Sequence, residues 1–530
     1  MTTRIRSTLR LLLLVCGCIL TLHGVQAVPS AQAQSEDVVV PELDEAEALF
    51  EQALDAFERG EYALAQRRFR LVTEYRLNQK TTASLLMAGK ALYRSGQHAR
   101  AIDVLTTLLD RYPETSYRAE AEEVLDYARS ARRRTQGEPD RIRVGIVLPL
   151  AGEDAPLAQA MFNGIRLAVD EHNGIERRYS AAGEEARVVR SAVASSRRVV
   201  AEQTNPPDRV AEMYFRNTRG DAAGTRAAVD SLVRIDNVDF IIGPLYSPEA
   251  QAAGEIAERA GVVMMAPLAT DGAVSAGRRY VFQANPTIET RGEIMARFAV
   301  RSLLVDGLGI IAEEGNDFSE RMAEGFRQEI ERLDAELAFD ERLPNARAWS
   351  QLQQELQPDS LSRDSLRRAE ALYLPIAGRD AGGRIQDALA GLDWLSRTSG
   401  ISFRVLGNAE WHGLTIEKLA SPFQATYTND FYVDETRRAV QIYMRRYRLL
   451  TGETLADLNV TARRLAFTGY DVARFMLEQA SVVMDQPLEQ IVREAPAYEG
   501  VGMKINFDGR NVNQAMFIHR YRNNQVDRLR

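Results

Sequence analysis

The stretch Arg143-Val-Gly-Ile-Val-Leu-Pro-Leu-Ala-Gly152 begins as a run of β-branched and other apolar residues and ends in a proline- and glycine-containing loop. Residues 156–172 follow with apolar residues at helical spacing, so that a strand leads directly into an amphipathic helix. Strands that alternate with helices form largely parallel sheets with right-handed crossovers. This stretch therefore predicts an α/β fold and marks the start of it.

The alternation occurs in two series, the second of which starts near Asn285. Two parallel sheets in tandem predict two lobes with a cleft between them. Two polar stretches, Gly174–Arg209 and Pro344–Arg368, do not fit a compact core and are expected to be surface excursions. The expected strands lie at residues 142–148, 211–215, 240–242 and 262–265, and then at 308–312, 337–341, 371–374 and 402–406.

Residues 45–131, ahead of this α/β part, show helical periodicity that is interrupted by turns at Gly60 and Gly96, 36 residues apart. That offset is close to the ~34-residue period of tetratricopeptide repeats, and the positions of small residues resemble that family. Two repeats and a capping helix are fewer than the three that such an array usually needs. We therefore expect the region to pack against the next domain or a partner. Its role is expected to be a peptide- or protein-docking surface, or else a spacer or oligomerisation element.

The N-terminus has the pattern of an export signal. Arg4, Arg6 and Arg10 precede a short apolar run, and small residues follow, which predicts a signal peptide at 1–33 with cleavage after Ala33. Cys18 offers an alternative as the lipidated residue of a lipoprotein. Linkers are expected at 34–44 and 132–140. The protein is therefore expected to be periplasmic or otherwise extracytoplasmic.

The composition of this chain of 530 residues argues against several classes of function. The formal net charge is −8, whereas nucleic-acid-binding domains are usually basic, so we expect no nucleic-acid partner. The five histidines are not at metal-ligand spacing, and no phosphate-binding loop, dinucleotide fingerprint or nucleophile elbow is present. We therefore expect a protein that is not an enzyme and that has no metal and no cofactor.

Seven short motifs follow one another in the α/β part: Arg143–Gly152, Ala168–Gly174, Ile241-Ile-Gly-Pro-Leu-Tyr-Ser247, Met265-Ala-Pro-Leu-Ala-Thr270, Tyr280–Pro286, Tyr498–Gly502 and Phe507–Gly509. In this order they resemble the motifs of type I periplasmic solute-binding proteins of the leucine/isoleucine/valine-binding branch. The resemblance implies one domain at 141–530, with lobe 1 at about 141–285 and 430–498 and lobe 2 at about 286–429 and 499–530.

Two of these motifs are similar to the family's ligand loops. The resemblance implies that Ser247 and Thr270, with the backbone near Leu268, hold the α-carboxylate of a ligand. The position agrees with the physics, because ligands of open α/β sheets lie beyond the carboxyl ends of strands and helix N-termini attract anions. Taken singly, each hydroxyl is equally typical of a helix cap or a turn.

The second lobe departs from the family pattern. Phe318 stands where the resemblance implies a tyrosine, so the phenol oxygen that would meet an ammonium group is missing. Asp317 is adjacent and is expected either to replace it or to cap the following helix. Glu410 is the candidate for the family's acidic residue, offset by about one position. Tyr246, Trp411 and Phe431 are expected to form apolar walls, but for Tyr246 and Trp411 a role in packing the lobes is equally expected.

Two functions are the main candidates, and a receptor-like sensor is a third alternative. The first is a solute-binding protein that closes two lobes on a small polar ligand, an amino acid or amide, for uptake through a membrane permease of the ABC transporter kind. The second follows from the order of the parts, because tetratricopeptide-like repeats ahead of a type I binding domain resemble the penicillin-binding protein activators of Gram-negative bacteria. There the same fold is a non-enzymatic interaction module for a cell-wall synthase, and the helical repeats are expected to make protein contacts.

Overall fold

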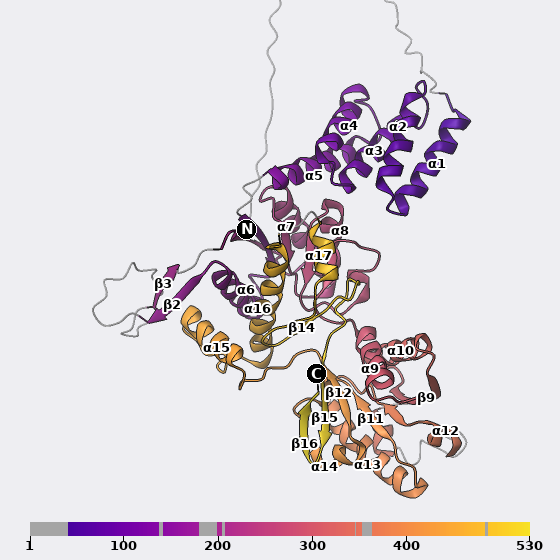
Figure 1. Cartoon of the computed structure of the whole chain (residues 1–530), viewed down its shortest axis with the longest axis vertical. Coiled ribbons are helices and arrows are strands. Elements are labelled where there is room, and N and C mark those ends of the chain that lie inside the picture. The colour runs from indigo at the N-terminus through magenta and orange to yellow at the C-terminus, as the bar shows by residue number, and fades with distance from the viewer. Residues whose placement is uncertain are drawn as a thin grey trace, which may run out of the picture.

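The computed structural model describes residues 41–136, 141–179, 199–203, 207–344, 346–351, 363–482 and 486–529. Three parts follow one another along the long axis: a helical region, a first lobe and a second lobe (Figure 1). The predicted signal peptide and Cys18 lie outside the described residues.

The helical region consists of two helical hairpins and a longer fifth helix. Gly60 and Gly96 form the two turns at φ values of 76° and 74°, a backbone conformation that glycine adopts without a steric penalty. The expected repeat is therefore present in the structure. The helices are α1 (Asp44–Glu58), α2 (Tyr62–Glu74), α3 (Thr81–Arg94), α4 (His98–Arg111) and α5 (Arg118–Gln136).

Helix α5 extends through Gln136, into the stretch that the sequence suggested as a linker. It packs with α3 and α4 against the first lobe, in one hydrophobic core that includes Leu105, Leu125, Leu232 and Ile256. Ion pairs flank this contact, among them one between Arg94 and Glu258 at 3.4 Å. The helical region thus buries apolar side chains against the first lobe. This contact replaces the burial that further repeats would provide in a longer array.

The first lobe contains a five-stranded sheet in the order β4-β1-β5-β6-β7, in which all strands are parallel. Helices cover both faces, as the alternating pattern predicts. The strands are β1 (Arg141–Leu148), β4 (Val210–Asn217), β5 (Phe240–Ile242), β6 (Val263–Ala266) and β7 (Val281–Gln283). The helices are α6 (Ala155–His172), α7 (Ala222–Arg234), α8 (Ser247–Ala260), α15 (Arg438–Thr451), α16 (Val460–Ala480) and α17 (Leu488–Glu494), with a 3₁₀ turn η1 (Gly272–Val274).

The second lobe repeats the parallel order in β9-β8-β10-β11-β12 and adds two antiparallel strands, β15 and β16, at one edge. Its strands are β8 (Gly307–Glu313), β9 (Glu336–Leu343), β10 (Ala371–Tyr373), β11 (Arg404–Gly407), β12 (Thr426–Asn429), β15 (Phe517–Arg522) and β16 (Gln525–Arg528). Its helices are α9 (Ile288–Ser302), α10 (Asp317–Arg332), α12 (Arg363–Arg368), α13 (Ala381–Ser399) and α14 (Glu417–Ala420), with 3₁₀ turns η2 (Ala346–Gln351), η3 (Ala409–Trp411) and η4 (Ser421–Phe423).

Each lobe contains one pair of helices in very close contact. A Cβ atom on Gly164 of α6 would lie 2.0 Å from the carbonyl oxygen of Ala466 in α16. In the second lobe a Cβ atom on Gly292 of α9 would lie 2.0 Å from the carbonyl oxygen of Met322 in α10. Glycine is needed at both positions because any side chain would overlap with backbone atoms.

The chain passes between the lobes three times. The short hairpin of β13 (Tyr498–Glu499) and β14 (Lys504–Ile505) still belongs to the first lobe, because Met503, Ile505 and Phe507 lie in its core. The last passage comes near Val512, which bridges to Gln283. The sequence suggested a boundary near residue 498, about a dozen residues earlier.

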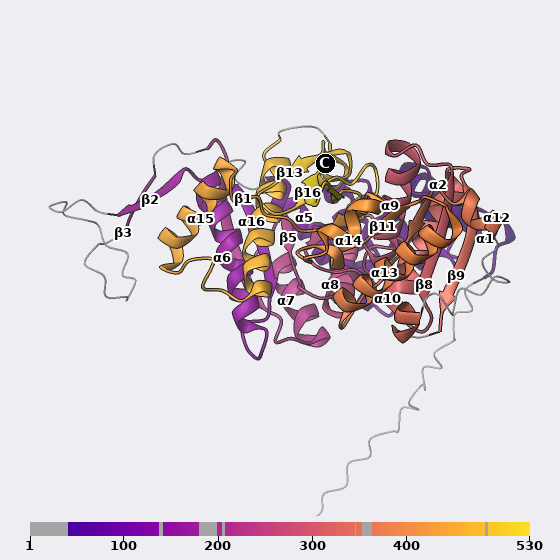
Figure 2. The ribbon, with the colours of Figure 1, turned by 90° about the horizontal axis from the view of Figure 1, so that it is seen from below.

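The described ends of the Gly174–Arg209 excursion form an antiparallel hairpin of β2 (Ile175–Tyr179) and β3 (Val199–Gln203). It projects from the first lobe beside α15 (Figures 1 and 2). The Pro344–Arg368 excursion is only partly a surface feature, because Trp349 and Leu366 are buried in the core of the second lobe.

Candidate functional site

Two loops of the first lobe meet at the carboxyl ends of neighbouring strands. Strands β5 and β6 pair in parallel, with Ile242 opposite Met265, so the loops that follow them leave the sheet side by side. Ser247 begins α8 in the first loop, and its hydroxyl oxygen accepts hydrogen bonds from the backbone N–H groups of Thr270 (3.2 Å) and Asp271 (3.3 Å). One side chain therefore joins the two loops.

This arrangement suits an anionic group. The Ser247 oxygen accepts two bonds and keeps its own hydrogen to donate, and it lies at the N-terminal end of a 14-residue helix, where the helix dipole favours negative charge. The carbonyl of Leu268 accepts a hydrogen bond from the side-chain amide of Asn285 (3.3 Å), which ties the second loop to the first crossover. Ser247, Leu268 and Thr270 are thus held together, each half-buried.

Tyr246 is partly exposed beside this pair of loops. Its hydroxyl donates to the Oδ1 atom of Asp154 at 3.1 Å, and burial together with this hydrogen bond raises the pKa of the tyrosine. The loop after β1 is thereby linked to the loop after β5. The sequence reasoning did not single out Asp154 or Asp271. Both are acidic residues a few positions beyond a strand end, which is the pattern that would have indicated them.

The second-lobe candidates are exposed and lie in helical elements that follow the ends of strands. Asp317 and Phe318 begin α10, and Phe318 is 50% exposed. Asn316 rather than Asp317 caps this helix, since its side chain accepts from the N–H of Ser319 at 3.4 Å. Asp317 instead pairs with Arg321 at 3.5 Å.

Glu410 is exposed on η3, where its N–H donates to the side chain of Asn408 at 3.3 Å. Within the described ranges, no hydrogen bond or ion pair joins Asp317, Phe318 or Glu410 to the loops around Ser247. The structure thus brings the first-lobe candidates together with one another and leaves the second-lobe candidates apart from them.

A buried carboxylate determines the shape of the second-lobe loop after β8. Glu313 is 3% exposed and accepts hydrogen bonds from Arg384 (2.6 Å), Trp349 (2.7 Å) and Asn316 (2.6 Å). A carboxylate with this many donors is fully paired and has little capacity left for a ligand. The sequence reasoning missed this cluster, whose members are far apart in the chain.

Of the two further aromatic candidates, Trp411 is completely buried in the core of the second lobe. It is a packing residue, which is one of the two roles expected for it. Phe431 lies at the second crossover and packs edge-on against Phe467, with ring centroids 6.0 Å apart. It belongs to the junction between the lobes.

The junction also contains a buried ion-pair cluster. Asp430 accepts from Arg291 of α9 (2.8 Å) and from Arg464 of α16 (2.7 Å), so its carboxylate connects helices of both lobes. Burial alone would raise the pKa of Asp430, but the two guanidinium groups hold it well below its usual range. The carboxylate is therefore charged at every physiological pH.

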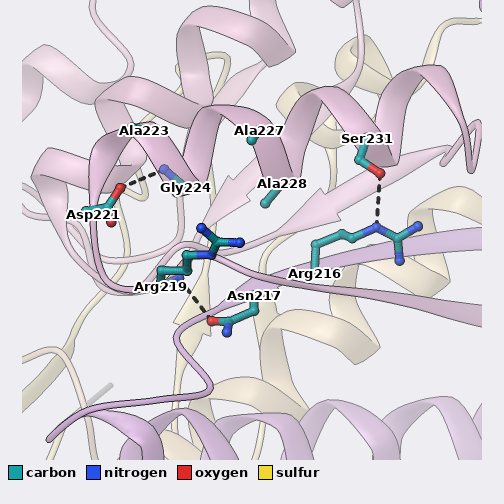
Figure 3. A pocket seen from close by; sticks show the side chains of 9 residues that line it. All are labelled: Arg216, Asn217, Arg219, Asp221, Ala223, Gly224, Ala227, Ala228 and Ser231. Carbon is teal, nitrogen blue, oxygen red and sulfur yellow. Dashed lines mark hydrogen bonds between the residues drawn. The ribbon is translucent and has the colours of Figure 1, made fainter. Parts of the chain in front are cut away.

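A hollow of about 450 Å³ lies at the sheet edge of the first lobe, between the end of β4 and α7 (Figure 3). Its polar groups are engaged locally: Asp221 accepts from the N–H of Gly224 (2.6 Å), and Arg216 donates to Ser231 (3.1 Å). None of the predicted ligand residues lines it. The hollow is therefore distinct from the loops around Ser247.

In the described part of the chain, no group of three or more His, Cys, Asp or Glu side chains is placed to hold a metal ion. In the same part, no helix combines the length and the apolar composition that crossing a membrane requires.

The chain was compared with known proteins. No curated relative matches the sequence. A family model described as "Periplasmic binding protein" matches residues 141–525, and one described as "Tetratricopeptide repeat" matches residues 83–115.

Solved structures share the fold at low identity. A putative branched-chain amino acid ABC transporter protein from Rhodospirillum rubrum is 18% identical, with a TM-score of 0.51 over 73% of this chain and 100% of that chain. The branched-chain amino acid substrate-binding protein LivJ from Streptococcus pneumoniae, solved with isoleucine, is 18% identical, with a TM-score of 0.40 over 73% and 98% of the two chains.

The first family match and the Rhodospirillum rubrum structure agree with the two-lobed α/β fold, and the second family match agrees with the helical repeats. The family is one of non-enzymatic solute-binding proteins located outside the cytoplasm. Through residues 141–525, which form both lobes, this chain belongs to the periplasmic binding protein family.

Proposed function

We propose that the two lobes bind a small ligand of the amino-acid kind and that the first lobe holds its carboxylate. The observation that carries this proposal is the hydroxyl of Ser247, which joins the loops after β5 and β6 through the N–H groups of Thr270 and Asp271. A ligand carboxylate would accept from the Ser247 and Thr270 hydroxyls and from backbone N–H groups near Leu268. Charge-assisted hydrogen bonds of this kind are the strong ones.

The rest of the site would form when the lobes close. Asp317 and Glu410 are acidic and exposed at the carboxyl ends of β8 and β11, where closure would bring them toward a ligand ammonium group. Tyr246 and Phe318 would supply the walls. A ligand that binds the closed form more tightly than the open form shifts the equilibrium toward the closed form. The size of this shift is set by the ratio of the two affinities. A membrane permease would then recognise the closed form outside the cytoplasm.

Thermal-shift measurements on residues 34–530 test this proposal, since a ligand that binds only the native state raises Tm. We expect at least one amino acid to raise Tm, and the combined Ser247→Ala and Thr270→Ala variant to abolish the shift. Ser231→Ala in α7 is the control, because this serine lies in the same lobe and contacts Arg216 instead. No shift with any amino acid would contradict the proposal.

A second candidate function is the activation of a cell-wall synthase of the penicillin-binding class through protein contacts. Three observations favour it: the helical region shares a core with the first lobe, Phe318 is half exposed where a ligand-binding tyrosine was expected, and Glu313 is already paired. A purified synthase provides the test. Saturable binding that Phe318→Ala weakens, without any amino acid raising Tm, would favour this function over the first.

A further inference from the structure

A second hollow, of about 290 Å³, lies on the second lobe at the edge formed by β12, β15 and β16 (strands labelled in Figure 1). The loop after η3 forms part of its lining. Its principal lining residues are His412, Tyr427, Tyr432, His519, Tyr521 and Arg528. No residue assigned above to the ligand loops lines it, so it is separate from the carboxylate-holding pair.

His519 lies at the bottom of this hollow. It is 2% exposed and is placed on β15 between Tyr427 of β12 and Arg528 of β16, its cross-strand neighbours. Its ring stacks on Tyr427 with centroids 5.2 Å apart. Neither ring nitrogen has a hydrogen-bond partner among the described residues. A buried polar group without a partner is rare and costs free energy, so a ligand in the hollow that bonded to these nitrogens would remove that cost.

His412 lies at the rim of the same hollow. It is exposed, its ring centroid is 5.5 Å from that of His519, and its Nδ1 atom is 3.2 Å from the hydroxyl of Tyr427. This leaves Nε2 for a ligand. Burial, with smaller effects of His412, Arg528 and Lys504, lowers the pKa of His519 to about 4, and burial also lowers the pKa of His412. Both rings are therefore neutral at pH 7, and each has one N–H group.

The charges around the hollow favour an anion over a metal ion. Arg528, Lys504 and Arg437 all pair with a single carboxylate, that of Glu499, at 2.7, 3.5 and 3.2 Å. Glu417 also lines the hollow, so three cations are balanced by two carboxylates and one positive charge remains in excess beside the imidazoles. Such a field attracts anions and repels divalent cations. The aromatic rings add flat apolar walls, on which the ring of a ligand can pack.

We propose that this hollow is a second ligand site, which binds a small ring-bearing organic anion through the N–H groups of His519 and His412 and the guanidinium of Arg528. The site is independent of the carboxylate-holding loops of the first lobe. Binding of a ligand at His519 therefore does not depend on whether a ligand binds at Ser247, and each site is tested separately.

Phenylacetate is a suitable probe, with phenylacetamide as its neutral counterpart of equal size. We expect calorimetry on residues 34–530 to show saturable binding of phenylacetate and much weaker binding of phenylacetamide. His519→Phe keeps the stacked ring and removes the nitrogens, and Arg528→Gln removes the charge. Each should weaken binding about tenfold or more, the usual effect of losing one hydrogen bond to a charged group.

One variant serves as the control. Arg522→Gln removes an arginine of the same sheet edge that does not line the hollow, and it should bind phenylacetate like the wild type. Ser247→Ala separates this site from the first-lobe loops, because the binding that His519→Phe weakens should persist in it.

Histidine ring NMR spectra provide a readout that does not depend on affinity. Phenylacetate should shift the signals of His412 and His519 and leave those of His98 and His172 in place. No binding, binding that Ser247→Ala abolishes, or binding without shifts at His412 and His519 would overturn the proposal.

Discussion

The two lobes share one strand order and one way of packing their helices, but they differ where a ligand would sit. In the first lobe, two loops converge on the hydroxyl of Ser247 and leave hydrogen-bond donors for an anion. In the second lobe, the loop after β8 is held by the paired carboxylate of Glu313, while Asp317 and Phe318 remain exposed. The two lobes therefore have the same fold, but the side chains of the loops expected to face a ligand differ between them.

The junction between the lobes is where the largest effect is expected. Asp430→Ala would leave Arg291 and Arg464 without their shared carboxylate, and we expect unfolding in urea to show a loss of about 3 kcal/mol. The carboxylate should stabilise the protein above about pH 4, and this contribution should vanish on acidification because its folded-state pKa is lowered. The variant should consequently lose less stability than the wild type between pH 5 and pH 3. Equal losses would show that Asp430 does not join the lobes in this way.

The Glu313 cluster distinguishes the second lobe from the first. Glu313→Gln keeps the volume but removes the charge opposite Arg384, which is 13% exposed. We expect a loss of about 2 to 3 kcal/mol in a chemical unfolding experiment. Adding Arg384→Gln to this variant should restore part of the loss, because the second substitution removes the unpaired guanidinium. If the single Glu313 variant is as stable as the wild type, the loop after β8 is not held by this carboxylate.

The close helix pairs test what the lobes have in common. Gly164→Ala in the first lobe and Gly292→Ala in the second would each force two helices apart, at a cost of about 2 kcal/mol. Calorimetric melting should show similar reductions in Tm for both variants. Gly383→Ala in α13 is the control, because its Cβ atom would enter open space. A large effect in one lobe alone would mean that the two helix pairs are not equivalent.

Phe318→Tyr should have the smallest effect on stability, since Phe318 is half exposed. We expect a stability change below about 0.5 kcal/mol. The added hydroxyl supplies the polar group that the second lobe lacks, so the affinity for an amino-acid ligand should rise a few-fold in a calorimetric titration. Unchanged affinity would place position 318 outside the ligand contact.

Local patterns in the sequence predicted much of the fold. The strand–helix alternation indicated both sheets, and Gly60 and Gly96 indicated the turns of the helical region, because each is a property of neighbouring residues. The resemblance to two family loops implied that Ser247 and Thr270 lie close together, and the pairing of β5 with β6 places their loops side by side. The end of α5 was less predictable, because its packing against the first lobe is a tertiary contact.

The buried polar clusters could not be predicted in the same way. Glu313 lies 36 residues from Trp349 and 71 from Arg384, and nothing local to any of them indicates a shared position. Asp430 and Arg291 are 139 residues apart. His519 is similar, because a histidine in an alternating strand gives no sign of which face will be buried beside a second histidine.

A calorimetric titration tests most directly whether the first lobe holds a ligand carboxylate at Ser247 and Thr270. Residues 34–530 are titrated with each amino acid and with the corresponding amino-acid amide, which lacks the carboxylate. We expect saturable binding of at least one amino acid, weaker binding of its amide, and a loss of this preference in Ser247→Ala. Equal affinity for acid and amide, or an acid preference that Ser247→Ala leaves intact, would contradict this placement of the carboxylate.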